Sequence, residues 1–388
     1  MPKDTRGIRP HVVVIAPNAY KGTLTAPDAA RAIRQGVNSV WPDAICQIVP
    51  LADGGDGFLD TLLAAPGSEQ FSCQVTGPMK MPASARVGWV GGSAARLAAV
   101  ELAEASGLVL IGSPSPETAL GATTRGLGEL ILTALTRGAT RVLVGLGGSA
   151  STDGGAGLAE ALGFRLLDRT GQAIGPGGKG LLELDRIDSA AASPLLQGAD
   201  LVAAYDVDSP LLGPLGAAAV FGPQKGADST TVAALERGLS RWAEVVERDL
   251  MLPRLDTQPG MGAAGGTGFG LATVAGALLE PGVSLVANFV GLDRALDQAE
   301  LVITGEGRFD RGSLAGKVTG EVLRRAATRH LPCLVVSGSA DPEAVLAARA
   351  LGGAVKSISS GEAAPPSLSG KLAFAQLRTA SRQACLEL

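Results

Sequence analysis

The chain has 388 residues, of which 46% are hydrophobic and 3% aromatic, and its 33 basic and 37 acidic residues give a net charge of −4. This length exceeds what one hydrophobic core usually serves, so we expect two domains. With few aromatic side chains and no long basic run, the composition argues against a nucleic-acid-binding protein. Any anion that the chain binds must therefore be held locally by a few residues.

The cysteines indicate neither a disulfide framework nor a zinc site. They are far apart, form no CxxC pair and have only two histidines to join them: Cys46, Cys73, Cys333 and Cys385, with His11 and His330. The apolar run at 12–16 is too short for a signal-peptide core, and no later run reaches the roughly 18 residues of a membrane-spanning helix. We therefore expect buried free thiols, no membrane partner and a cytoplasmic location.

The first elements are a strand, a loop and a helix. A β-branched run at 12–16 predicts a strand, and helical spacing begins at Ala26. Thr25, followed three residues later by Asp28, predicts a helix N-cap with an acid in the first turn. The connecting loop then covers 17–24.

The middle of the chain is less regular but again mixes strands with Ala/Leu-rich helices. The predicted strands are 95–101, 141–146, 163–168 and 200–205, and the predicted helices are 125–137, 154–163 and 229–250. The last part returns to short apolar strands separated by helices, at 301–307, 332–339 and 354–359, followed by a loop at 361–370 and a final helix. Alternating strands and helices predict parallel sheets covered by helices.

This order predicts two α/β domains. Residues 1–80 and 286–388 are expected to form a discontinuous Rossmann-like or flavodoxin-like domain with a parallel sheet, and residues 81–285 an inserted α/β domain. In such sheets, ligands bind where loops leave the carboxyl ends of the strands. The Gly-rich loops after the predicted strands are therefore the first places to look for chemistry.

The loop GLGGSASTDGG at 145–155 is a candidate phosphate site. Gly147 and Gly148 would let a phosphate approach the backbone, and hydroxyl donors follow at Ser149, Ser151 and Thr152. Structural Gly-rich turns between a strand and a helix are also common, and the alternative for Asp153 is the N-cap of the next helix. The chain has no GxxxxGK[ST] sequence, so it is not a P-loop enzyme.

Carboxylates follow two further predicted strands. Asp53 and Asp56 bracket two glycines in PLADGGDG, and Asp206 ends an apolar strand with Asp208 two residues on. Each suits contact with a metal ion or a hydroxyl group, while an Asx turn is the structural alternative.

Cations stand in three other loops. Lys225 lies in FGPQKGA, and Lys21, with Asn18 nearby, lies in the loop after the first strand. The segment TGEGRFDRGSLAGK offers an arginine suited to bidentate capture of a carboxylate, together with acids and a lysine: Arg308, Glu306, Asp310 and Lys317. Each has an ordinary alternative, a surface ion pair or a solvated lysine.

Taken in order, these segments resemble the type-1 glycerate kinases. The similarity runs nearly end to end through APNAYKGTLTA, PLADGGDG, VELAEASGL, ATTRGLGELI, GGSASTDGG, DVDSPL, FGPQKGA, GAAGG and TGEGRFD. The resemblance implies a discontinuous domain with a second one inserted, the glycerate kinase I fold, and ATP with Mg²⁺ as cofactors. It also implies transfer to the 2-hydroxyl of D-glycerate, with homo-oligomer formation left open.

The site residues expected from these arguments fall into four groups. The catalytic ones are Asp206, Asp53 and Lys21. No histidine lies in a candidate motif, so a carboxylate must accept the hydroxyl proton. Asp206 is expected to be that acceptor or its close magnesium-holding partner, because partial burial at the end of an apolar strand would fix its position. The others are Asn18, Arg308, Glu306 and Asp310 for the substrate, Gly147, Gly148, Ser149, Ser151, Thr152 and Lys225 for the nucleotide, and Asp153 with Asp206 for the metal.

The sequence departs from the family at a few of these positions. The family usually has aspartate, serine and phenylalanine where this chain has Asn18, Ala19 and Tyr20. It also has glutamate at Asp56, and a threonine–asparagine pair at Ser151 and Thr152. Loss of an acid at Asn18 could alter the preferred acceptor.

Two rival functions remain open at this stage. Gly145, Gly147 and Ala150 form G-x-G-x-x-A after a strand, with Asp168 near the distance expected for a ribose-binding acid, as in an NAD(P)-dependent dehydrogenase of a small hydroxy acid. Alternatively, Asn18 favours a catalytically silent sensor of glycerate or nucleotide.

Overall fold

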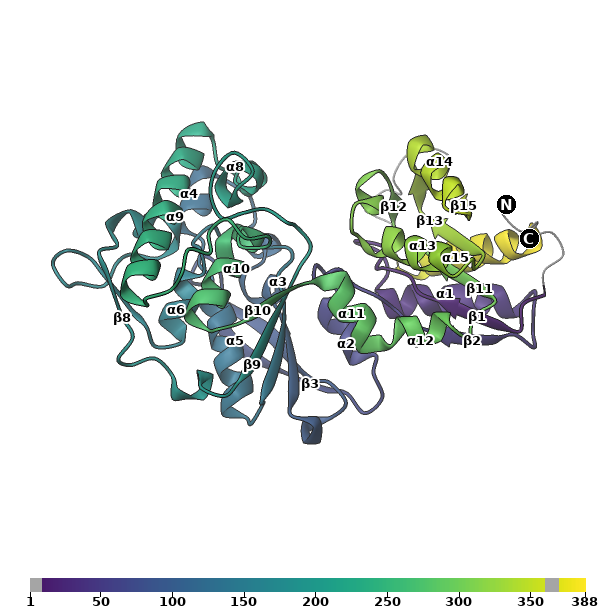
Figure 1. Ribbon diagram of the computed structural model, residues 1–388, viewed down its shortest axis with the longest axis horizontal. Helices are drawn as coiled ribbons and strands as arrows, with labels where there is room; N and C mark the ends of the chain where they lie inside the picture. Colours follow the sequence, from purple (N-terminus) through teal and green to yellow (C-terminus); the bar gives the residue numbers. More distant parts are fainter. Residues whose placement is uncertain (1–8, 360–369) are drawn as a thin grey trace. The chain divides into compact units, whose positions relative to one another are not determined.

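The computed structural model of the chain describes residues 9–359 and 370–388, which form two compact units (Figure 1). Unit 1 consists of Met1–Asp53, Asp60–Ala64 and Val283–Leu388, and unit 2 of Gly54–Leu59 and Ala65–Gly282. The chain thus enters unit 2 before residue 80, because the hairpin that follows pairs with the sheet of unit 2. The domain division expected from sequence stays a prediction, and most of the predicted loop at 361–370 lies outside the described residues.

Unit 1 contains a five-stranded sheet in which all neighbouring strands are parallel. Its order is β15 (Gly353–Ser357), β13 (Cys333–Ser337), β11 (Leu301–Thr304), β1 (Val12–Ile15) and β2 (Ile45–Ile48). Numbered within this unit, the order is 2-1-3-4-5, which is flavodoxin-like. The predicted α/β class with parallel sheets is confirmed.

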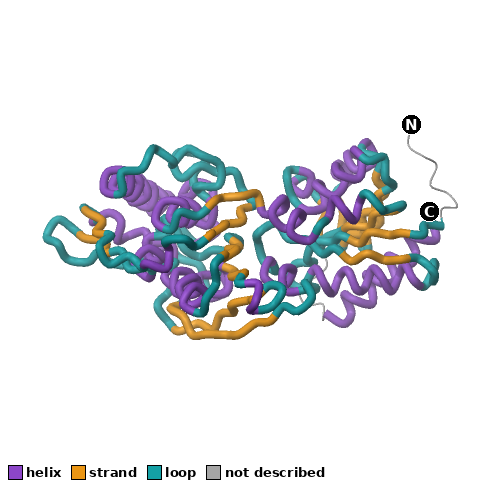
Figure 2. Tube along the Cα trace, turned by 60° about the horizontal axis from the view of Figure 1, so that its bottom comes forward, coloured by secondary structure: helices purple, strands orange, loops and turns teal. Residues whose placement is uncertain are grey.

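The helices of unit 1 cover the sheet on both sides (Figure 2). They are α1 (Ala26–Asn38), α11 (Gly282–Val290), α12 (Leu292–Leu296), α13 (Val318–Thr328), α14 (Pro342–Ala350) and α15 (Gly370–Leu386). Thr25 caps α1 as predicted, accepting a hydrogen bond from the Asp28 N–H at 3.2 Å. Helices α1 and α15 pack closely at Gly36, where a Cβ atom would lie 2.6 Å from the Arg378 carbonyl oxygen. The short strands β12 (Arg308–Phe309) and β14 (Ser339–Ala340) form a second, two-stranded sheet.

Unit 2 contains a six-stranded mixed sheet. Its order is β10 (Leu278–Pro281), β9 (Asp200–Tyr205), β6 (Arg141–Gly145), β5 (Leu97–Glu101), β4 (Pro82–Trp89) and β3 (Glu69–Thr76). The first four are parallel, whereas the β3–β4 hairpin joins antiparallel at the edge. The remaining strands, β7 (Arg165–Leu167) and β8 (Arg186–Asp188), form a separate antiparallel pair.

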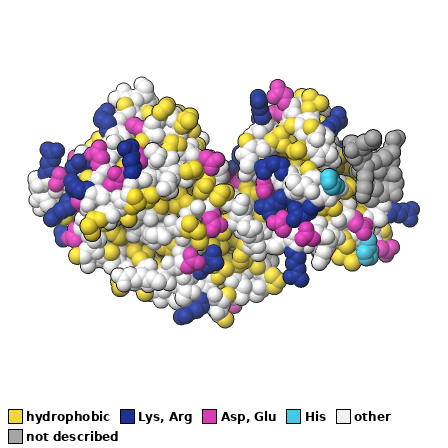
Figure 3. Space-filling view, in the orientation of Figure 1, with side chains coloured by type: hydrophobic (Ala, Val, Ile, Leu, Met, Phe, Trp, Pro, Cys, Tyr) yellow, Lys and Arg dark blue, Asp and Glu magenta, His cyan; other side chains and the backbone are white. Residues whose placement is uncertain are grey.

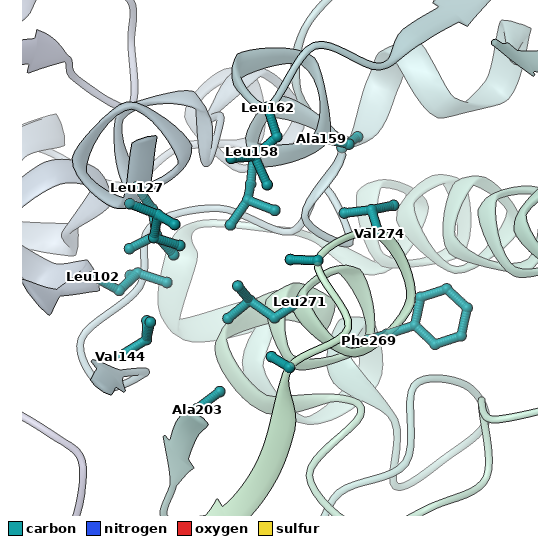
Figure 4. Packing of buried hydrophobic residues seen from close by; sticks show 14 of the residues in the cluster. Leu102, Leu127, Val144, Leu158, Ala159, Leu162, Ala203, Phe269, Leu271 and Val274 are labelled. Atoms are coloured by element: carbon teal, nitrogen blue, oxygen red, sulfur yellow. The ribbon is translucent and has the colours of Figure 1, made fainter. Parts of the chain in front are cut away.

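The core of unit 2 is built from Leu, Val and Ala side chains of these strands and of the helices beside them (Figure 4). The helices are α3 (Leu102–Ser106), α4 (Pro116–Gly121), α5 (Arg125–Thr136), α6 (Ala156–Ala161), α7 (Gly177–Gly180), α8 (Ala217–Phe221), α9 (Ser229–Asp249) and α10 (Ala263–Val274). Helix α2 (Phe58–Leu63) spans a changeover between the units. Trp242 is fully buried, and its Nε1–H donates to the Gly154 carbonyl at 2.9 Å.

The surface carries acids and bases side by side. On the face seen in Figure 3, Lys and Arg side chains lie next to Asp and Glu side chains. Such interspersed charge does not favour a phosphate backbone as partner. Among the described residues, no helix combines the length and apolar character needed to cross a membrane.

Candidate functional site

A cavity of about 440 Å³ lies in unit 1 at the carboxyl ends of the parallel strands. Asn18 follows β1, Glu306 follows β11 and Gly338 follows β13, and all three line it. The strand order reverses between β1 and β11, which is where open α/β sheets bind ligands. This unit 1 cavity brings together the predicted residues Asn18, Lys21, Asp53, Glu306, Arg308 and Asp310.

The loop after β1 is fixed by hydrogen bonds within unit 1. The Asn18 N–H donates to the Gly305 carbonyl at 2.9 Å, and the Asn18 Oδ1 accepts from the Ala19 N–H at 2.8 Å. The Tyr20 hydroxyl, which sequence reasoning did not assign to the site, donates to the Val336 carbonyl at 2.5 Å. Burial, with the nearby Glu306 carboxylate, raises the pKa of Tyr20. Tyr20 therefore stays protonated and ties this loop to β13.

Glu306 is, with Asp53, a buried acid of the unit 1 cavity. It is 9% exposed, burial raises its pKa, and its Oε1 has no hydrogen-bond partner among the described residues. A buried polar atom without a partner is costly, so a ligand group or a cation that reached it would be stabilised.

Arg308 is loosely held at the rim of this cavity. Its Nη2 lies 3.4 Å from both Asp341 carboxylate oxygens, and its Nε lies 3.7 Å from Asp310 Oδ2. The side chain is 59% exposed, and exposed pairs of this kind contribute only about 0–1 kcal/mol. Arg308 can therefore turn towards an anion at little cost.

Unit 2 has a smaller cavity of about 280 Å³ next to the Gly-rich loop. Gly147, Gly148, Ser149, Asp206 and Lys225 line it. Asp206 directly follows β9 but is exposed, so the partial burial expected from its strand-end position was wrong. This unit 2 cavity joins the predicted proton acceptor to predicted nucleotide-binding residues.

Lys225 is the buried cation of the unit 2 cavity. It is 2% exposed, and its Nζ donates to the Ser151 carbonyl at 2.5 Å and lies 3.5 Å from Ser149 Oγ. Burial lowers the pKa of Lys225 to about 7, while the Asp153 carboxylate acts in the opposite direction. An anion bound in this cavity would favour the charged form of the lysine.

Ser151, Thr152 and Asp153 are fully buried, and Asp153 binds backbone N–H groups near the starts of α5 and α6. Its carboxylate accepts from the Thr124 N–H at 2.8 Å, from Thr124 Oγ1 at 2.9 Å, and from the Gly155 and Gly157 N–H groups at 3.2 Å. Burial nevertheless raises its pKa. The N-cap of α6 is Gly155, so the helix-cap alternative for Asp153 was wrong. Its contacts with backbone N–H groups nevertheless disfavour the predicted metal role, which stays untested.

The glycines of this loop are closely packed. A Cβ atom on Gly147 would lie 2.2 Å from Gly55 Cα, and one on Gly148 would lie 2.8 Å from Asp56 Oδ1. Gly148 also has a φ of +70°, which disfavours other residues. The glycines are thus required by the approach of another Gly-rich segment, whether or not a phosphate binds beside them.

Sequence reasoning also missed Glu101, which is buried at the end of β5. Its Oε1 accepts from the Gly57 N–H and its Oε2 from the Leu59 N–H, both at 3.1 Å. Burial raises its pKa to about 7 despite these two hydrogen bonds. Glu101 thus holds the DGGDG segment in place. The sequence signal that could have identified Glu101 was its position as an acid at the end of an otherwise apolar predicted strand.

The structure argues against the dehydrogenase alternative. Asp168 follows β7, which pairs with β8 in a two-stranded sheet separate from the six-stranded sheet that holds β6. Its carboxylate is exposed and binds the backbone of its own turn, at Thr170 and Gln172. The parallel neighbours of β6 are β5 and β9, so Asp168 does not end a strand beside the G-x-G-x-x-A loop, where a dinucleotide fold places its ribose-binding acid.

Comparisons with known proteins agree with the sequence resemblance. A sequence model described as the glycerate kinase family matches residues 13–385. A glycerate kinase from Bacillus subtilis (strain 168) is 43% identical over 84% of this chain and 85% of its own, and a glycerate 2-kinase from Escherichia coli (strain K12) is 42% identical over the same shares. A crystal structure from Salmonella typhimurium LT2, provisionally assigned as glycerate kinase 2, superposes with a TM-score of 0.79 at 35% identity over 96% of both chains.

Proposed function

Since this chain belongs to the glycerate kinase family, we propose that it transfers the γ-phosphoryl group of ATP to the 2-hydroxyl of D-glycerate, giving 2-phosphoglycerate and ADP. The printed name of the Escherichia coli relative supports the 2-position. The structural observation that supports a two-substrate reaction is that each unit has a cavity with charged side chains where loops leave the carboxyl ends of its parallel strands.

The acceptor hydroxyl needs a proton acceptor. As its oxygen bonds to the γ-phosphorus, the bond to the ADP oxygen breaks and the hydroxyl proton must leave. Asp206 is our candidate, because its carboxylate lines the unit 2 cavity beside the buried Lys225. A carboxylate there can orient the hydroxyl and take its proton, and the lysine can balance the charge of an acid substrate. Asp53 and Lys21, both on the unit 1 cavity, complete the catalytic residues we propose.

Magnesium would enter as the complex with ATP. Mg²⁺ in such sites keeps several waters and takes one or two carboxylates besides the phosphates, so a three-carboxylate cluster is not required. Among residues 9–359 and 370–388, no group of three or more His, Cys, Asp or Glu side chains could hold a metal. Glu306, with its buried unpartnered oxygen, and Asp53 are the unit 1 acids that fit one such position.

ATP as a substrate and four free cysteines support a cytoplasmic address. A homo-oligomer stays a prediction, which light scattering on the purified chain would test.

The test of the reaction is ³¹P NMR of the products formed from MgATP and D-glycerate. We expect ADP and the resonance of 2-phosphoglycerate, which is distinguishable from that of 3-phosphoglycerate. Folded protein that forms no ADP above a blank without glycerate would contradict the kinase proposal, and 3-phosphoglycerate would contradict its position. The same experiment decides against a silent sensor.

A further inference from the structure

The two cavities differ in a way that the sequence did not reveal. The unit 1 cavity, about 440 Å³, lies in the size range of about 300–1,000 Å³ that holds drug-sized ligands. The three-carbon acid predicted to bind there is much smaller than such a ligand. The unit 2 cavity, about 280 Å³, lies just below that range.

Apolar side chains make up part of the lining of the unit 1 cavity. Leu24, which is 9% exposed, Ile358 and Ala373 line it, together with the buried Tyr20. Glycerate consists of a carboxylate and two hydroxyl-bearing carbons, so it has little apolar surface to bury there. A purine base has two flat apolar faces and a polar edge, which suit an aliphatic wall with the Gln376 amide beside it.

Three cations also line this cavity, Lys21, Arg308 and Lys317. They come from the loop after β1 and from the segment after β11, on both sides of the point where the strand order reverses. Flavodoxin-like sheets bind a mononucleotide at this switch point. The buried Glu306 Oε1, unpartnered within the described part of the chain, adds a polar position for a cation or a ligand N–H group.

We propose that the unit 1 cavity is the nucleotide site, with the adenine of ATP against Leu24, Ile358 and Ala373 and the phosphates facing Lys21, Arg308 and Lys317. The acid then falls to the smaller unit 2 cavity, with its carboxylate near Lys225 and its hydroxyl near Asp206. This exchanges the two roles expected from the sequence. It rests on the proposed use of ATP, but it can be tested without turnover.

The test is a substitution that places a larger side chain among the apolar residues of the unit 1 cavity and leaves its charged residues unchanged. Ala373 and Ala375 are both half-buried on α15, but only Ala373 lines the unit 1 cavity. Calorimetric titration with the magnesium complex of a non-hydrolysable ATP analogue should give a Kd at least about tenfold weaker for Ala373→Phe than for wild type. Ala375→Phe, the matched control, should stay within about twofold of wild type. Thermal unfolding should show that both variants are folded.

Three results would overturn the assignment. They are an unchanged nucleotide Kd in Ala373→Phe, no binding of the analogue to wild type, and a raised KM for D-glycerate with unchanged nucleotide affinity. If the wild type binds the analogue as expected but the NMR experiment shows no phosphoglycerate, the kinase proposal fails and the nucleotide site stands.

Photolabelling keeps the proposal falsifiable if Ala373→Phe does not fold. Wild-type protein irradiated with 8-azido-ATP should be labelled on the peptides that contain Ile358 or the α15 residues 370–386, and excess ATP should protect it. Label confined to unit 2 peptides, such as one containing Lys225, would place the base in the other cavity and refute the assignment.

Discussion

Asp206 and Asp208 are both exposed aspartates in the segment after β9, but only Asp206 lines the unit 2 cavity. Asp206→Asn keeps the shape of the side chain and removes its charge. If Asp206 takes the hydroxyl proton, kcat should fall by about 10²–10⁴. Because the side chain is exposed, the melting temperature should change little. Steady-state kinetics with saturating ATP and D-glycerate would measure the effect.

Asp208→Asn is the matched control and should keep near-normal kcat. If Asp206→Asn also keeps near-normal kcat while Asp53→Asn loses it, the proton acceptor is Asp53. The exposure of Asp206 changes the reason for choosing it: its position is favoured by its place on the cavity beside Lys225, and not by burial.

At the scale of elements, the Gly-rich loop is held by its contacts within unit 2. Gly147→Ala would place a Cβ atom 2.2 Å from Gly55 Cα, a backbone atom that cannot move aside without disturbing the DGGDG segment. Such overpacking typically lowers the free energy of unfolding by about 1–3 kcal/mol. We therefore expect unit 2 of the Gly147→Ala variant to unfold at a lower temperature than unit 2 of the wild type. Thermal unfolding monitored by circular dichroism would measure the difference.

Gly175→Ala provides the comparison for this loop. Gly175 has ordinary backbone geometry, and a Cβ atom there meets nothing within 4 Å. The melting temperature of the Gly175→Ala variant should match that of wild type. If the Gly147→Ala protein has the melting temperature of wild type but binds nucleotide more weakly, the predicted role of the loop in phosphate binding is supported instead.

Local sequence signals predicted most elements of the sheets. The strands around Val12–Ile15 and Leu301–Thr304, and the cap at Thr25, follow from β-branched runs and capping chemistry. The β3–β4 hairpin was not predicted, although its partner β5 was. Its pairing at the edge of the unit 2 sheet depends on contacts with distant strands, which no local pattern encodes.

The candidate site was predicted only as a list of residues. The sequence grouped Asn18, Asp53 and Arg308 by their places after strands, and the structure puts them on one cavity. The sequence could not show that Ser151 and Thr152 are fully buried, or that Gly147 lies against the backbone of Gly55. Burial and cavity size are set by side chains from distant segments, so ligand size could not be inferred.

At the scale of the whole molecule, each unit has its own core. Trp41 belongs to the core of unit 1, and Trp89 and Trp242 belong to that of unit 2. These are the only three tryptophans of the chain. Separate cores predict that unfolding is not a single two-state transition.

The Trp41→Phe variant allows the unfolding of the two units to be measured separately. In that variant all tryptophan fluorescence comes from unit 2, whereas far-ultraviolet circular dichroism follows both units. We expect the two signals to give transitions at different urea concentrations. Coincident curves would mean that the two cores unfold as one cooperative body.

The discontinuity of unit 1 has a consequence for synthesis on the ribosome. β1 lies between β2 and β11, and β11 is made only after the whole of unit 2. At about 5–20 residues per second, β1 waits on the order of 15–60 seconds for this neighbour. During that time the strand Val12–Ile15 exposes an open edge that can pair with other nascent chains. Unit 2 is complete first, so the yield of native protein should depend on how well chaperones shield this N-terminal segment until translation ends.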